Sequence, residues 1–394
     1  MTTTNAKQPL VAMALALIAA ALLAVIYFAP IWWVALKAPN YPPEAFPDGV
    51  RIHFHMNGVF NGCKKVERTE ILEKEALDCV HEMDTINHYV GMYPIAAGGP
   101  VERFFSPFLL SMLGVMVIGF ACTRRNFRVG LVAGGFAAIA AWMAVTYFGT
   151  DGLKYQSAGY VLAQVTAMDQ DAGEGDKHGA ESDTSGAGLI ARLKAELEKS
   201  ERKAKDTEQA SHVSEKQRFI NSLRITFQKD QERKGSKTEW NGSGRQLMLW
   251  HYEKNLGRYF NNPAEITPLV SKMSVAGTVM FFGMLAAMLV VLYGAWQGRG
   301  PLYWLMGLAP IGLPLFFVID YSGWLYWFGH NMNEMGAFTV KAFMPTVFGD
   351  GKVAQFSTHS YPYWGFGVMI AFAVVVALLV LLKKNEAGRA ATGR

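Results

Sequence analysis

The stretch from Cys79 to Met92, CVHEMDTINHYVGM, concentrates side chains that bind metals. A helix here would place His81, Asp84 and His88 at positions i, i+3 and i+7 of one stripe, with Met92 one turn further on. Imidazole and thioether groups together suit copper, whereas oxygen ligands alone would suit calcium or magnesium. The pattern therefore predicts a copper site on one face of this helix. The alternative interpretation is a polar surface helix whose histidines make ordinary hydrogen bonds.

Two other segments carry further imidazole and thioether groups. In RIHFHM, the alternation of a strand would place His53 and His55 on one face. A later aromatic-rich stretch, 320 to 363, contributes more such side chains, and no neighbouring pair forms a closed site alone. We therefore expect ligands from RIHFHM and from the stretch Cys79 to Met92 to converge with ligands from 320 to 363. The complete predicted set is His53, His55, His81, Asp84, His88, Met92, His330, Met332 and His359.

The rest of the sequence predicts a membrane protein that presents these segments. The chain has 394 residues, of which 51% are hydrophobic, and the apolar residues gather in uncharged runs. Such runs are long enough to cross a hydrocarbon core of about 30 Å. We expect a mainly α, polytopic membrane fold with about six transmembrane helices and three extracytoplasmic segments. The predicted spans are about 10 to 34, 105 to 122, 129 to 148, 270 to 295, 301 to 319 and 364 to 382.

Basic residues at the ends of the spans predict their orientation. The loop TRRNFR, Arg299 and the tail beginning Lys383 are expected in the cytoplasm, because short cytoplasmic loops are enriched in Lys and Arg. Both termini would then be cytoplasmic and the main loops periplasmic, in a bacterial inner membrane. These flanks account for the net charge of +5 without a nucleic-acid partner.

This topology divides the chain into seven predicted segments. The segment 149–269 contains a Gly-, Asp- and Ser-rich stretch, DQDAGEGDKHGAESDTSGAG, which is typical of a linker, and densely charged helical sequence follows it. The segments are an N-terminal anchor at 1–34, a first extracytoplasmic segment at 35–104, a transmembrane hairpin at 105–148, a charged, partly flexible helical arm at 149–269, a second hairpin at 270–319, a second His/Met aromatic segment at 320–363, and a final transmembrane helix with a basic tail at 364–394.

Two cysteines of the first extracytoplasmic segment are candidates for a disulfide. Cys63 and Cys79 lie at the two ends of a predicted helix, and thiols outside the cytoplasm tend to be oxidised. We favour a structural bridge over thiolate ligation of a metal.

Several common chemistries have no signature in this sequence. No histidine lies within a predicted span, as a membrane cytochrome b would need, and the Cys-x-x-Cys-His motif of c-type haem is absent. The chain also lacks Walker, dinucleotide-binding, zinc-protease and serine-hydrolase motifs. Asp84 and Asp320 are candidate acids, but no nucleophile and base form a pair. An enzyme of an ordinary class is therefore disfavoured.

Two parts of the chain resemble a known family. APNYPP at 38–43 and INHYVGM at 86–92 are similar to elements of a membrane-protein family encoded beside clade II, Sec-type nitrous oxide reductases, and DYSGWLYWFGHNMNEM resembles a later element of that family. The resemblance covers about a third of the chain. Met332 replaces an expected Leu, Glu334 and Met335 interrupt the pattern, and the charged insertion around 160 to 260 is additional. The matched positions are Asn87, His88, Tyr89, Gly91, Met92, Gly329, His330 and Asn331.

The resemblance implies a function, because that family is thought to assist copper delivery or maturation of the reductase. We expect a membrane-anchored accessory protein that binds or delivers copper on the extracytoplasmic side for a copper oxidoreductase such as nitrous oxide reductase. One alternative is a structural subunit that docks a redox protein without its own metal. A second is a membrane enzyme resembling a copper-dependent monooxygenase.

Overall fold

The computed structural model describes residues 7–64, 77–172, 215–337, 341–353 and 355–392. Within these ranges the chain is mainly helical, and several helices are long and apolar enough to cross a membrane. Most of the linker and the first charged stretch of the segment 149–269, together with most of the predicted helix before Cys79, lie outside the described residues.

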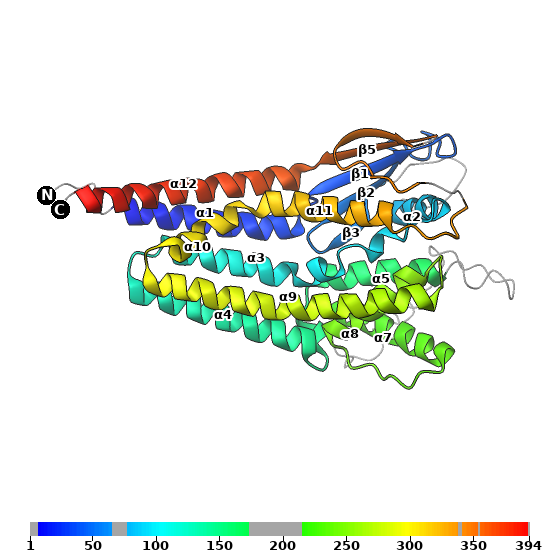
Figure 1. Ribbon diagram of the computed structural model, residues 1–394, viewed down its shortest axis with the longest axis horizontal. Helices are drawn as coiled ribbons and strands as arrows, with labels where there is room; N and C mark the ends of the chain where they lie inside the picture. The colour runs from blue at the N-terminus through cyan, green and yellow to red at the C-terminus, as the bar shows by residue number, and fades with distance from the viewer. Residues whose placement is uncertain (1–6, 65–76, 173–214, 338–340, 354, 393–394) are drawn as a thin grey trace, which may run out of the picture.

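Five long apolar helices form the bundle in Figure 1. A sixth hydrophobic region consists of two shorter helices, which are bent by 61° at a break at Gly312 that Pro310 and Pro314 flank. Proline lacks a backbone N–H and disrupts the helical ladder, which accounts for the bend. The long helices are α1 (Lys7–Phe28), α3 (Pro100–Ala121), α4 (Arg125–Phe148), α9 (Pro263–Gln297) and α12 (Trp364–Thr392), and the bent pair is α10 (Pro301–Ile311) and α11 (Leu313–His330).

The first helix is shorter than expected, because α1 ends at Phe28 rather than near residue 34. Pro30 follows at once, and the apolar residues after it form strand β1 (Trp32–Lys37). One uncharged apolar run therefore contains both a helix long enough to cross a membrane and a strand, which hydrophobicity alone does not separate.

Strand β1 is the centre of an antiparallel five-stranded sheet in the order β3-β2-β1-β5-β4. Trp32 pairs with Phe54 on one side and with Pro362 on the other, so the sheet joins the two ends of the chain. The predicted strand at RIHFHM is confirmed as β2; the other four strands were not predicted. Their bounds are β2 (Val50–His55), β3 (Gly58–Asn61), β4 (Gly349–Val353) and β5 (Phe356–Pro362).

Shorter helices lie, like the sheet, at the end of the bundle opposite the termini (Figure 1). In the segment 149–269, the described helices pack against the protein body through buried Ile220, Leu223 and Phe227. Buried Asp230 accepts hydrogen bonds from Trp250 and Lys254, which ties α7 to α8. The short elements are α2 (Cys79–Tyr89), η1 (Ile95–Ala97), η2 (Gly152–Tyr155), α5 (Ala158–Ala172), α7 (Glu215–Lys234) and α8 (Gly244–Gly257).

The predicted disulfide is confirmed. Cys63, just after β3, is bonded to Cys79, the first residue of α2. The bridge fastens α2 to the sheet at the point where a buried cluster of Leu36, Ile52 and Met83 packs between them.

Candidate functional site

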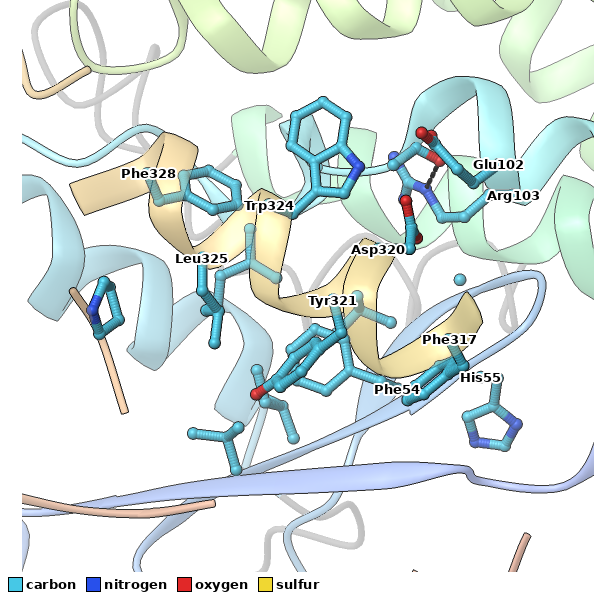
Figure 2. A pocket seen from close by; sticks show the side chains of 18 of the residues that line it. Phe54, His55, Glu102, Arg103, Phe317, Asp320, Tyr321, Trp324, Leu325 and Phe328 are labelled. Atoms are coloured by element: carbon cyan, nitrogen blue, oxygen red, sulfur yellow. Dashed lines mark hydrogen bonds between the residues drawn. The ribbon is translucent and has the colours of Figure 1, made fainter. Parts of the chain in front are cut away.

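A cavity of about 240 Å³ lies where the sheet meets the helix bundle (Figure 2). Its walls come from β1, β2, α2, α3, α9, α11 and the segment 343–346. All three hydrophobic clusters of the described chain reach it, since Met284, Phe328 and Met83 each belong to a different cluster. The cavity is thus the junction of the bundle, the sheet and α2.

One part of the wall carries the charged residues. Glu102 and Arg103 lie in the first turn of α3, and Figure 2 shows Asp320 of α11 beside them, with the indole of Trp324 adjacent. Arg103 donates to the carbonyl oxygens of Gly99 at 3.1 Å and Ala96 at 2.6 Å. Among the described residues, the buried Oε2 atom of Glu102 has no hydrogen-bond partner. A buried ionisable group in an apolar pocket, without a hydrogen-bond partner in the protein, is typical of a binding site.

Methionine is concentrated around the same cavity. It supplies six of the 36 lining residues, compared with 19 of the 394 residues of the chain. This enrichment exceeds threefold and brings thioether groups from four separate parts of the sequence to one place. The six are Met56, Met83, Met92, Met280, Met284 and Met344.

His55 is the one predicted histidine that lines the cavity. Its Nδ1–H donates to the carbonyl oxygen of Phe28 at 3.1 Å, and because a carbonyl only accepts, the Nε2 atom keeps its lone pair. Burial lowers the pKa of His55 to about 4, so the ring is neutral near pH 7. A neutral imidazole oriented by a backbone carbonyl is a common arrangement for a metal ligand.

The predicted stripe on α2 is present, but Asp84 and His88 have separate partners, and the buried Nδ1 atom of His81 has no hydrogen-bond partner among the described residues. Asp78 caps the helix by accepting from the backbone N–H groups of Val80 and His81. Asp84 is 1% exposed and accepts a hydrogen bond from the backbone N–H of Ile95 at 2.7 Å. His88 donates to the Thr85 carbonyl at 2.7 Å and is stacked on Tyr259.

The remaining predicted ligands lie outside the cavity lining and have separate surroundings. His53 is stacked on Tyr363, and burial lowers its pKa to about 4. Exposed His330 donates to the carbonyl of Tyr326 at 2.9 Å and stacks on that ring. Met332 packs at the edge of an apolar cluster.

His359 forms a pair of its own at the sheet surface. It donates to Asp350 at 2.6 Å, and this hydrogen bond, with a second from Tyr361, holds the pKa of Asp350 below its usual range. Within the described ranges, no three His, Cys, Asp or Glu side chains come together as a metal-binding group. Of the predicted set, the cavity gathers His55 and Met92.

The two elements that carry the family resemblance do meet. Asn333, two residues after the matched Asn331, donates its backbone N–H to the carbonyl of Gly91 at 2.7 Å. The side chain of Asn333 donates to Glu265 at 2.8 Å, which links both elements to the start of α9. The segments 35–104 and 320–363 are therefore in contact next to the cavity.

Sequence reasoning did not identify Glu102, Arg103 or Trp324 as site residues. The available signal was the pair of charges at the very start of an apolar span, since ionisable residues within membrane segments are rare and usually functional. Comparisons with protein families, with characterised proteins and with solved structures find no match to this chain.

Proposed function

We propose that this membrane-anchored protein holds copper(I) in the cavity beneath the sheet and hands it to a partner. The observation that carries the proposal is the gathering of His55 and six methionines around one cavity. Copper(I) is a soft ion that accepts thioether and imidazole ligands. The other predicted histidines would then stabilise the surrounding structure or take part in copper transfer, and they would not bind the copper(I) ion held in the cavity.

The chemistry of the lining fits a transient copper site. His55 offers an unprotonated nitrogen, and Met83 and Met92 are buried sulfur donors on and just after α2. Met344 lines the cavity while 46% exposed, which provides a donor at the solvent side. A graded series of weak sulfur donors would allow copper(I) to leave toward a partner.

The proposed partner is an extracytoplasmic copper oxidoreductase such as nitrous oxide reductase, as the family resemblance implies. The distribution of charge supports this side of the membrane. Arg124, Arg299 and Lys383 belong to the end of the bundle that carries both termini, opposite the sheet and the cavity (Figure 1). By the positive-inside rule the cavity would face the periplasm.

A docking subunit without its own metal is the second candidate. It is favoured by large exposed apolar side chains in the segment 320–363, where Met335 is 75% exposed and Phe348 is 67% exposed. Exposed apolar groups of this size are common at protein interfaces. This function requires no ligand in the cavity.

Copper(I) titration separates the two functions. The purified full chain, titrated anaerobically against the chromogenic chelator bicinchoninate, should retain copper(I). The triple variant Met83→Leu, Met92→Leu, Met284→Leu keeps the apolar volume but removes three sulfurs, and should lose at least tenfold in affinity. The matched control Met116→Leu, Met306→Leu alters buried methionines outside the cavity and should bind as the wild type does. Equal affinity in all three proteins would contradict the proposal.

A further inference from the structure

The cavity extends from the sheet into the hydrophobic part of the bundle. Phe105 and Leu109 of α3, Met284 of α9 and Phe317 of α11 belong to its wall. The first three residues lie in helices that are long and apolar enough to span a membrane, and Phe317 lies in the bent pair α10 and α11, which is apolar enough only when both helices are taken together. The cavity therefore adjoins the region that lipid would occupy.

Phe316 lies between the cavity and that region. It lines the cavity and is also 43% exposed, and its neighbours Leu315 and Ile319 are 64% and 62% exposed on the same helix. Exposed apolar side chains on a spanning helix face lipid. Phe316 is therefore the lining residue at which the cavity would meet the lipid.

The cavity lining is rich in aromatic rings. Figure 2 shows Trp324 beside the charged group and Tyr321 on the same stretch of α11 as Asp320, and Phe105 of α3 also lines the cavity. Aromatic side chains favour a flat ring as a partner through offset or edge-to-face contacts. A volume of about 240 Å³ is below the roughly 300–1,000 Å³ of pockets for drug-sized ligands, so it suits one ring rather than a lipid with two chains.

The charges select the head group of that ring. Glu102 and Asp320 supply two carboxyl groups, and none of the ion pairs within the described residues engages either of them. Arg103 supplies one guanidinium, which is already bonded to two backbone carbonyls. An anionic head, as in a fatty acid or phospholipid, would be repelled by an ionised carboxyl group at this site. A neutral head with hydroxyl groups would donate hydrogen bonds to them, including the unpartnered Oε2 of Glu102.

We propose that the cavity binds a neutral, membrane-soluble ring compound that carries hydroxyl groups, of the quinol class, with its hydroxyls on Glu102 and Asp320 and its ring against Trp324 and Tyr321. The tail would leave past Phe316 into the bilayer. This site uses carboxyl and aromatic groups, and it does not depend on the copper(I) proposal.

The test measures binding of tritiated decylubiquinol to the metal-free full chain in nanodiscs of synthetic lipid, with empty nanodiscs as the background. We expect saturable binding of one molecule per chain. The dimethyl ether of the same quinol has no hydroxyl hydrogens, so it cannot donate hydrogen bonds to Glu102 and Asp320. An excess of this ether should compete at least tenfold more weakly than unlabelled quinol. Stearate should not compete.

The variant Glu102→Gln, Asp320→Asn keeps the shape of the wall and should bind the quinol about tenfold or more weakly. Asp350→Asn, on the sheet surface, should bind it as the wild type does. Binding no greater than in empty nanodiscs, equal competition by the dimethyl ether, or competition by stearate would overturn the proposal. Because the competition assay uses the wild-type chain, it remains decisive if the variant does not fold. Copper(I) is then added to the same preparations and its retention is measured. This second measurement separates failure of the quinol proposal from failure of the copper proposal.

Discussion

The backbone N–H of Asn333 donates a 2.7 Å hydrogen bond to the carbonyl oxygen of Gly91. This contact joins the end of the INHYVGM element to the loop after α11. Gly91 has a φ of +85°, and a Cβ atom added to it would collide with the carbonyl oxygen of Asn333. Glycine is therefore required both for the left-handed backbone and for the close approach of the two segments.

Replacement of Gly91 by alanine should destabilise this junction. Backbone strain at a positive φ and the collision with Asn333 together predict a loss of about 1–3 kcal/mol in the free energy of unfolding. Thermal unfolding in detergent should show the shift. Gly283→Ala is the matched control, because open space surrounds its added Cβ on α9. Equal melting temperatures for Gly91→Ala and wild type would show that the junction is looser than described.

A buried ion pair makes α2 depend on α8. Arg258 Nη1 lies 3.4 Å from Asp84 Oδ2, and both side chains are almost fully buried. Asp84→Ala would leave the guanidinium without this carboxylate and should cost about 3–5 kcal/mol of unfolding free energy. Adding Arg258→Met should recover part of the loss, because the uncompensated charge is then removed. A double variant less stable than the sum of the single effects would refute this coupling, as chemical unfolding of all three variants can determine.

The two histidines of β2 predict how stability varies with pH. Burial lowers the pKa values of His53 and His55 to about 4, whereas an unfolded histidine titrates near 6.5. Between these values the unfolded chain binds more protons, so stability should be complete above about pH 6.5 and decrease as pH falls toward 4. Melting temperatures measured from pH 7.5 to 4.5 test this. The variant His53→Gln, His55→Gln should show a smaller decrease than wild type, and an unchanged decrease would assign the effect to other groups.

The orientation can be tested by labelling single cysteines introduced at the two ends of the bundle. Ser357 lies in β5 and Ala391 near the end of α12. If the sheet is periplasmic, Ser357→Cys should react with a membrane-impermeant thiol reagent in intact cells, and Ala391→Cys should react only after lysis. The reverse pattern would place the cavity in the cytoplasm and remove the proposed periplasmic partner.

Local patterns predicted the parts of the fold that local physics determines. The apolar runs predicted the helices that are long enough to cross a membrane, the alternation in RIHFHM predicted β2, and the positions of Cys63 and Cys79 predicted the disulfide. The sheet was missed because β1 is hidden within an apolar run and pairs with β5, more than 300 positions away: Trp32 donates its indole N–H to Ser360 at 2.9 Å, across 328 positions. Such pairings depend on the tertiary fold rather than on nearby residues.

The site, like the sheet, depends on contacts between distant residues. Local spacing predicted the stripe on α2, and His55 and Met92 do line the cavity. However, the partners of Asp84 and His88, which are Arg258 and Tyr259, come from a distant helix end that no spacing rule could place. The methionine cavity likewise draws residues from 56 to 344, so only the assembled fold brings them together.

X-ray absorption spectroscopy of the copper(I)-loaded full chain tests the central claim most directly. The proposal predicts a copper edge typical of the reduced ion, with a first shell containing sulfur and one nitrogen ligand. His55→Gln should remove the nitrogen contribution, and the triple variant Met83→Leu, Met92→Leu, Met284→Leu should reduce the sulfur contribution. A first shell with only nitrogen or oxygen ligands, unchanged in the triple methionine variant, would show that copper(I) does not reside in this cavity.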